Sequence, residues 1–254
     1  MTLALLAVAF GLAIGLSLGL VGGGGSILAV PVLVYVLGEP VAQATTASLV
    51  IVGATALAGG VAHHHAGRTR LRVAALFGLG GAVGAVAGTA LQRLASPGSI
   101  LLGFALLMLL AAWGMVRGLP LGARSAPDGR PETLRRAVPA GVAVGILTGF
   151  FGVGGGFVIV PALVLVLGME MPLAVGTSLL VISLTSGAAL LAHLHGGAVD
   201  WPTAIAFTAG GVAGALAGSR LVRGTSSARL TQTFAAVTTL VAIFLIVKNV
   251  HAIA

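Results

Sequence analysis

The chain has 254 residues, of which 58% are hydrophobic and only 7% carry a charge, and its formal net charge is +8. A soluble domain of this size needs a far more polar surface, so the composition predicts a protein embedded in lipid. The absence of cysteine excludes disulfides and thiolate metal sites. Basic loops on the cytoplasmic side of a membrane explain the positive charge, and we expect no nucleic-acid partner.

Apolar runs along the chain predict membrane-spanning helices. Six runs are each long enough for one crossing, and they cover residues 44–62, 73–92, 99–117, 174–192, 203–219 and 230–247. Two further runs, 3–37 and 137–167, are too long for one straight span at about 1.5 Å per residue. Glycines interrupt both long runs, so we expect each to form two helical pieces, either a re-entrant hairpin or a pair of short spans.

The chain contains an internal duplication. Residues 15–93 and 145–223 align with a constant offset of 130 and no gap, and about 30 of these 79 positions are identical. We therefore expect an all-α polytopic membrane protein with an N-terminal repeat (1–117), a linker (118–136) and a C-terminal repeat (137–254), each repeat having a glycine-broken helix followed by three transmembrane helices. Such duplications are typical of transporters, whose two related halves surround one site at the midplane.

The basic residues predict how the two halves are oriented. If each broken run returns to its starting side, 11 of the 13 basic residues lie on one side of the membrane, whereas a single crossing by each run would divide them 9 to 4. The positive-inside rule favours the first arrangement, in which the halves are inverted. We expect both termini outside the cell and the linker 118–136 in the cytoplasm.

The two glycine breaks are the first candidate substrate-binding elements. A helix that begins inside the membrane presents unpaired N–H groups and a positive dipole end, which can bind an anion. The same glycines could instead serve only close helix packing. The candidate residues are Gly22, Gly23, Gly24, Gly25 and Ser26 in the first half and Gly152, Gly154, Gly155 and Gly156 in the second.

Hydroxyl groups open the helix that follows each break. They could complete the hydrogen-bond shell of an anion without a countercharge that would trap it, or they could bond only to carbonyls of their own helix. The candidate residues are Thr45, Thr46 and Ser48 in the first half and Thr177 and Ser178 in the second.

Histidines recur at the far ends of the same two helices, where His63 and His65 correspond to His193 and His195. They are candidates for a pH-sensitive gate or a proton relay, and anchoring at the membrane interface is the plainer alternative. A metal site would need further ligands, and Asp200 is the nearby carboxylate. We expect no metal and no cofactor.

The sequence shows no pairing of a nucleophile with a base, so we do not expect an enzyme. The acidic residues all fall in predicted loops, which leaves a coupling proton or sodium ion unassigned; these residues are Glu39, Asp128, Glu132, Glu170 and Asp200. The expected partners are the lipid bilayer and a small anionic substrate. A homo-oligomer is compatible with the sequence.

Four motifs, at residues 19–31, 149–161, 174–179 and 193–201, resemble the paired signatures of the sulfite exporter TauE/SafE family. The resemblance covers essentially the whole chain. It implies an inner-membrane permease of two homologous halves that moves small sulfur-containing anions such as sulfite, sulfonates or thiosulfate. By position, it implies binding elements at 22–26, at 152–156 and around Thr177 and Ser178. Residues 44–49 depart from the family pattern, because they read Ala-Thr-Thr-Ala-Ser-Leu rather than Ala-Val-Gly-Thr-Ser-Leu.

The leading hypothesis is therefore a secondary transporter for a small oxyanion that works by alternating access. Two alternatives remain. One is a passive anion channel of the same architecture, and the other is a metal-ion permease that uses the histidines at 63–65, 193 and 195.

Overall fold

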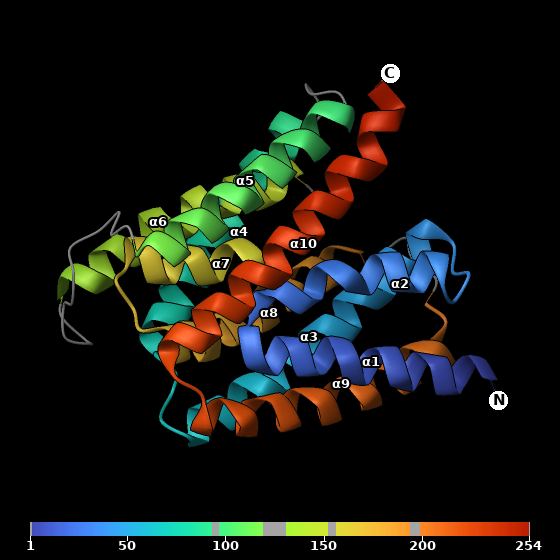
Figure 1. Cartoon of the computed structure of the whole chain (residues 1–254), viewed down its shortest axis with the longest axis horizontal. Helices are drawn as coiled ribbons and strands as arrows, with labels where there is room; N and C mark the ends of the chain where they lie inside the picture. Colours follow the sequence, from blue (N-terminus) through green and yellow to red (C-terminus); the bar gives the residue numbers. More distant parts are fainter. Residues whose placement is uncertain (1, 93–96, 119–130, 152–155, 194–198, 254) are drawn as a thin grey trace.

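The computed structural model describes residues 2–92, 97–118, 131–151, 156–193 and 199–253, which form helices joined by short connections (Figure 1). The predicted all-helical class is confirmed for this part of the chain, which contains no strand. Seven helices in the described residues are long and apolar enough to cross a membrane.

The helices follow the order of the two repeats. The first half contains α1 (Thr2–Val21), the 3-10 segment η1 (Gly23–Leu28), α2 (Ala29–Tyr35), α3 (Val41–His65), α4 (Leu71–Gln92) and α5 (Pro97–Arg117). The second half contains α6 (Pro131–Phe151), α7 (Gly156–Pro161), the π-helical turn η2 (Ala162–Val166), α8 (Met171–His193), α9 (Trp201–Leu221), the 3-10 turn η3 (Val222–Gly224) and α10 (Ser227–Ile253).

The six predicted single spans coincide with α3, α4, α5, α8, α9 and α10. One boundary differs, because α6 already begins at Pro131 and includes the last residues of the predicted linker. Proline is favoured at the first position of a helix, where its fixed φ suits the helix and its missing N–H leaves no bond unmade. The hydrophilic composition of this segment therefore did not prevent it from being helical.

The two pieces of each broken run are unequal. α1 has 20 residues and α6 has 21, enough for a full crossing, whereas η1 has 6 residues and α2 has 7. The chain then doubles back, since Gly25 packs against Ile14 and Leu18 of α1. Each short return ends at a glycine with positive φ, +74° at Gly38 and +68° at Gly168, a common way to terminate a helix.

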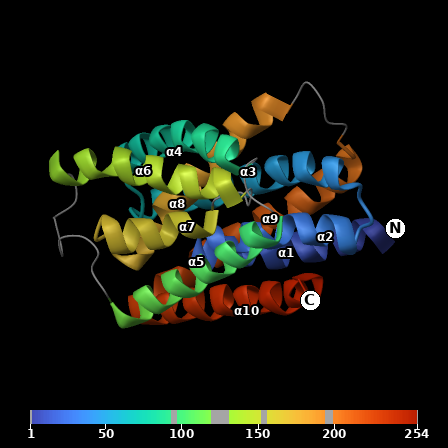
Figure 2. The same cartoon turned by 90° about the horizontal axis from the view of Figure 1, so that it is seen from above.

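The two halves interlock. α1 packs most extensively on α9, and α6 packs in the same way on α4. Because α1 corresponds to α6 and α4 to α9 in the duplication, these are two copies of one interface. Two further contacts join corresponding helices directly, α3 with α8 and α5 with α10 (Figure 2). Neither half could bury its apolar helices in this way without the other.

Glycines bring the interlocking helices into backbone contact. A Cβ on Gly11, Gly15 or Gly19 of α1 would overlap the α9 backbone at Phe207, Gly211 and Ala215, respectively. The duplicated glycines Gly141, Gly145 and Gly149 of α6 stand in the same relation to Phe77, Gly81 and Ala85 of α4. The ascending order of these contacts shows that each pair of helices is parallel. Small residues at such positions let membrane helices approach closely.

Corresponding helices α3 and α8 run antiparallel, because Gly53 faces Ser186 while Gly60, further along α3, faces Leu180. This is the relation that inverted halves require. Both chain ends lie on the right of Figure 1, and α5 ends and α6 begins on the left. The orientation of the two halves within a membrane stays a prediction.

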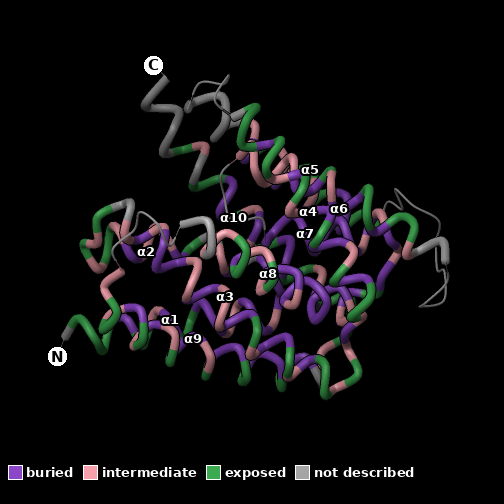
Figure 3. Tube along the Cα trace, turned by 180° about the vertical axis from the view of Figure 1, so that it is seen from behind, coloured by how far each residue is buried: buried purple, intermediate pink, exposed green. Residues whose placement is uncertain are grey.

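The middle of the molecule is buried and the outer helices are exposed (Figure 3). α7 is buried along its whole length, and α8 carries buried residues in most of its turns. The short helix α7 therefore lies inside the bundle, whereas α2 buries only Ala29 and Leu33 and exposes Tyr35.

Candidate functional site

The first break depends on the conformation of Gly22. Its φ is +78°, which side chains disfavour, and a Cβ there would lie 2.6 Å from Ser178 Oγ and 2.8 Å from Val160 Cγ2. α1 therefore ends where the backbone turns sharply against α7 and α8 of the other half. The duplicated Gly152 lies outside the described residues, as do Gly154 and Gly155, and no surroundings are described for Gly24.

The structure brings the two breaks together. A Cβ on Gly23 would overlap the backbone of Gly156, and a Cβ on Gly156 would lie 2.6 Å from Ser26 Oγ and 3.1 Å from Gly23 Cα. The sequence predicted two breaks that approach one site, and the structure shows their backbones in direct contact. Close packing, the alternative weighed for these glycines, is thus part of their role, and binding of a substrate there stays a prediction.

The serine hydroxyls near the breaks donate to carbonyls of their own segments. Ser26 Oγ donates to the Gly23 carbonyl at 2.7 Å, Ser178 Oγ to the Val175 carbonyl at 2.8 Å, and Ser48 Oγ to the Thr45 carbonyl at 2.7 Å. A hydroxyl has one proton to donate. In this arrangement these three serines therefore offer only lone pairs, and each must rotate before it can donate to an anion.

Thr177 and Ser178 are neighbours that face different parts of the molecule. Ser178 faces the break at Gly22, whereas Thr177 Oγ1 accepts a hydrogen bond of 3.1 Å from the N–H of Arg70. Gly176, just before them, lies against the backbone of Arg68. The conspicuous Gly-Thr-Ser sequence therefore joins the connection between α3 and α4, which we call the arginine loop (residues 66–70), to the first break.

The corresponding hydroxyls of the first half lie at the start of α3. Thr46 and Ser48 are buried and Thr45 is half-buried. Thr46 occupies the position of Gly176 in the repeat, and Ala47 occupies that of Thr177. The hydrogen bond that Thr177 makes thus has no counterpart from Ala47.

The three consecutive histidines have three environments. His63 is fully buried, with Nε2 3.0 Å from the Gly19 carbonyl; because a carbonyl only accepts, Nε2 carries the donated hydrogen. Its Nδ1 has no hydrogen-bond partner among the described residues. The exposed His64 has Nδ1 2.8 Å from Thr69 Oγ1, and His65 is exposed.

The surroundings of the corresponding histidines in the second half are not described, because the side chain of His193 and the whole of His195 lie outside the described residues. Within the described part of the chain, no three side chains of His, Cys, Asp or Glu lie together as a metal site would require. His63 instead holds a carbonyl near the end of α1, where the break leaves carbonyls without helical partners.

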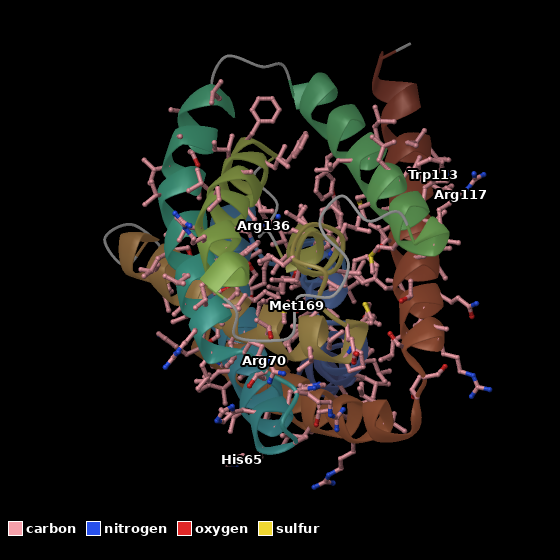
Figure 4. The ribbon with its side chains drawn as sticks, turned by 90° about the vertical axis from the view of Figure 1, so that its left-hand side faces the viewer. His65, Arg70, Trp113, Arg117, Arg136 and Met169 are labelled. Carbon is pink, nitrogen blue, oxygen red and sulfur yellow. The ribbon has the colours of Figure 1, made fainter. Side chains whose placement is uncertain are left out.

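Many basic residues lie at one end of the molecule, and two acidic residues lie together at the opposite end. Figure 4 views the end where α3 ends and α4 begins, and there the labelled Arg70 lies in the arginine loop, Arg117 at the end of α5 and Arg136 near the start of α6. We call this the basic end. At the opposite, acidic end, Glu39 precedes α3 and lies near Asp200, the residue before α9. Asp200 also accepts a hydrogen bond from Thr203 Oγ1.

The pKa of Glu39 is raised above its ordinary value of 4.5, first by burial of the carboxyl and then by the negative charge of Asp200. The sequence placed both residues in loops and assigned them no role. The duplication carried a usable signal, because the offset of 130 aligns Arg70 with Asp200 and Met169 with Glu39. Corresponding loops at the two ends thus carry different charges.

Interlocked helical halves with broken helices meeting inside the bundle are the architecture of a membrane transporter. The model of the family described as sulfite exporter TauE/SafE matches residues 7–245, and the chain belongs to this family. It is therefore a multi-pass membrane transporter protein, and the resemblance noted in its motifs is confirmed.

Relatives share nearly the whole chain. A probable membrane transporter protein of Xylella fastidiosa (strain 9a5c) is 38% identical over 244 residues, which cover 93% of this chain and 92% of that protein. The probable membrane transporter protein YdhB of Bacillus subtilis (strain 168) is 28% identical over 210 residues, 82% of this chain and 85% of the relative. YunE of the same organism, similarly named, is 28% identical over 238 residues, 85% and 87% of the two chains. No solved structure matches significantly.

Proposed function

We propose that this protein is a secondary transporter for small anions, of the class of sulfur oxyanions and organosulfonates such as sulfite, and that it works by alternating access of its two halves. The observation that carries the proposal is the contact of the two glycine breaks inside the bundle, at Gly23 and Gly156, beside the hydroxyls of Ser26 and Ser178. The family description supports the sulfur-containing class of substrate.

The groups at the breaks suit an anion that must be bound and then released. The side chains found there, those of Ser26, Ser178 and Val160, carry no charge, and the rest of the contact is backbone. Hydrogen bonds from hydroxyls and N–H groups to a charged ligand contribute about 1.5–3 kcal/mol each. A few such bonds hold an anion without the desolvated countercharge that would make its release slow.

The contact of the breaks represents a closed arrangement. The backbones at Gly23 and Gly156 touch, so an anion can pass only when the two short helices separate. The first break is held against helices of both halves, because Gly22 lies against α7 and α8 while Gly25 lies against α1. A rocking motion of one half against the other would open the contact toward one side at a time.

The proposed orientation places the basic end in the cytoplasm of the cell and both termini outside, with the protein in the inner (plasma) membrane. The distribution of basic residues supports this orientation, and the antiparallel run of α3 and α8 supports the inversion of the halves. A tag accessibility assay at each terminus in intact cells tests it, with a terminus reached only after permeabilisation as the contradicting result.

Flux of a labelled anion into proteoliposomes tests the proposed function. We expect uptake of sulfite or ethanesulfonate by wild type and at least a tenfold slower rate for Ser178→Ala, since one hydrogen bond to a charged ligand is worth about that factor or more. Ser186→Ala is the matched control, because Ser186 is buried on the same helix but faces Gly53. Absence of anion flux in wild-type vesicles, or equal rates in the two variants, would contradict the proposal.

A further inference from the structure

A depression of about 410 Å³ opens on the surface of the basic end. It lies where the arginine loop, the start of α8 and the connection from α9 to α10 meet, and it is lined by Ala66, Arg68, Pro172, Val222 and Thr225. Its volume is within the range of about 300–1,000 Å³ that is common for ligand pockets. A small anion would only partly fill it and would keep part of its water.

Arg68 is the charged residue of the lining, and its backbone is fixed. Its N–H donates to the His63 carbonyl at 2.9 Å, and its own carbonyl packs directly against Gly176. Its guanidinium makes a long contact of 3.5 Å with the Ser219 carbonyl near the end of α9. A guanidinium presents a planar fork of donors that matches the oxygens of a sulfonate or sulfite.

The surrounding charges favour an anion. Arg70 follows in the same loop. Arg72 near the start of α4 and Arg220 near the end of α9 are exposed, and both lie at the basic end. The basic end is not free of negative charge, because the acidic Glu170 lies two residues before Pro172 in the sequence. Clustered charges of one sign raise the local concentration of oppositely charged solutes.

We propose that this depression is a docking site in which Arg68 binds the oxyanion group of the transported solute before it reaches the breaks. The proposal rests on the proposed function and adds a second, peripheral site to it. The site connects to the breaks through three consecutive residues of α8: Gly176 lies against Arg68, Thr177 holds Arg70, and Ser178 faces Gly22. Two residues along a helix span only about 3 Å.

At the acidic end, the residue that corresponds to Arg68 is not basic. The duplication aligns Arg68 with Ala198 and Arg70 with Asp200, and Asp200 lies near Glu39. An anion that approaches this end meets negative charge in place of the guanidinium. Docking should therefore occur at one face of the protein only.

Cysteine reactivity measures the site directly, because the natural chain has no cysteine. Thr225→Cys places a thiol in the lining, and Ser227→Cys places one on the exposed surface nearby. Each is treated with the anionic 2-sulfonatoethyl methanethiosulfonate and the cationic 2-(trimethylammonium)ethyl methanethiosulfonate. The ratio of the two rates reports local charge and cancels any change in the reactivity of the thiol itself.

We expect an anionic-to-cationic rate ratio about tenfold higher at position 225 than at 227, and its loss when Arg68→Gln is added, since a unit charge in the same lining acts on the two reagents with opposite sign. Arg72→Gln removes a charge outside the lining and is the matched control, so it should lower the ratio far less than Arg68→Gln does. Ethanesulfonate should slow labelling at 225; sulfite is unsuitable because it cleaves the reagents. An unchanged ratio with Arg68→Gln, or no protection by ethanesulfonate, would overturn the proposal.

Two further arms identify the ligand and guard against misfolding. Arg68→Lys keeps the charge but not the planar fork, so it should keep the rate ratio while weakening protection by ethanesulfonate. The labelling is repeated in nanodiscs with and without phosphatidylglycerol, and protection by this lipid alone would assign the site to a headgroup and overturn the proposal. Failure of the proposed function is distinct, because it would appear as absent flux in wild-type vesicles.

Discussion

The basic end and the acidic end of this transporter are built from the same helices, yet they differ in chemistry. At the basic end, Thr177 anchors the arginine loop; at the acidic end, the aligned position is Ala47, and the aligned loop residue is Asp200 instead of Arg70. Between the two ends, the helix interfaces are nearly identical copies, down to the glycines that bring α1 onto α9 and α6 onto α4. The duplication thus kept the packing and changed the loops.

This contrast separates the features that the two halves share from those in which they differ. Glycines that recur in both halves serve contacts that any version of the fold needs, because a side chain there would displace a backbone. Residues that differ between corresponding loops carry what distinguishes one face of the membrane from the other. The following experiments challenge that division, first at the shared interfaces and then at the ends.

Bulky residues in the shared interface should have the largest effect. Gly15→Val would force a side chain into the Gly211 backbone, and Gly145→Val would do the same at Gly81, so each should cost about 3 kcal/mol or more and prevent folding. Gly187, which has open space around it, is the control: Gly187→Ala should gain about 0.5–1 kcal/mol. Thermal unfolding of the detergent-purified variants measures their stability. A folded Gly15→Val protein of wild-type stability would contradict the claim that this glycine is required for the packing of α1 on α9.

Loss of the buried histidine should come next in size. His63→Phe removes the hydrogen bond to the Gly19 carbonyl, and a buried carbonyl left unpaired costs about 1–3 kcal/mol. The exposed His65 makes a matched comparison, because His65→Phe should change stability by less than about 0.5 kcal/mol. Equal effects in thermal unfolding would show that the two histidines share a role at the interface and that burial does not distinguish them.

Thr177→Ala makes the second half resemble the first, where alanine occupies the same position. The N–H of Arg70 loses its acceptor, which should cost about 1–2 kcal/mol and release the arginine loop. Thr177→Ser keeps the acceptor and serves as the control. Hydrogen exchange of the arginine loop, measured by mass spectrometry, should rise in the alanine variant alone; equal exchange in both variants would show that the loop is held by other contacts.

The acidic end should give the smallest effect, visible as a dependence on pH. Because the pKa of Glu39 is raised, the folded protein binds this proton more tightly than the unfolded chain, so stability falls as the pH rises from 4.5 through the raised value. Glu39→Gln should therefore gain stability relative to wild type as the pH rises above 4.5. Asp200→Asn should reduce the same loss, and parallel curves for all three proteins would contradict the interaction.

Much of the fold could be predicted from the sequence, because apolar run length and the duplication fixed the single spans and the position of both breaks. The unequal division of the broken runs could not, since composition does not show that η1 returns along α1. The packing of α1 on α9 could not be predicted from the sequence either, because a repeat shows which helices correspond and not which helices are in contact.

The candidate site was predicted as a region and not in its details. Gly22, Gly23, Ser26, Gly156 and Ser178 do meet, as two converging breaks would require. Thr177 was grouped with Ser178, but consecutive residues of a helix point about 100° apart, and Thr177 serves the arginine loop instead. Glu39 was placed in a loop without a role, and Arg68 was only one of the basic residues counted for orientation, because only the three-dimensional arrangement shows what each loop contacts.

Counterflow in proteoliposomes tests most directly that the two breaks form a carrier for small anions. Vesicles that contain wild-type protein are loaded with unlabelled ethanesulfonate at millimolar concentration and diluted into a trace of the labelled anion. A carrier that alternates between its two faces should accumulate label inside, transiently, well above the outside concentration, and Ser178→Ala should slow that accumulation. Equilibration without any overshoot would indicate a passive channel, and no movement of label would contradict anion transport through these breaks.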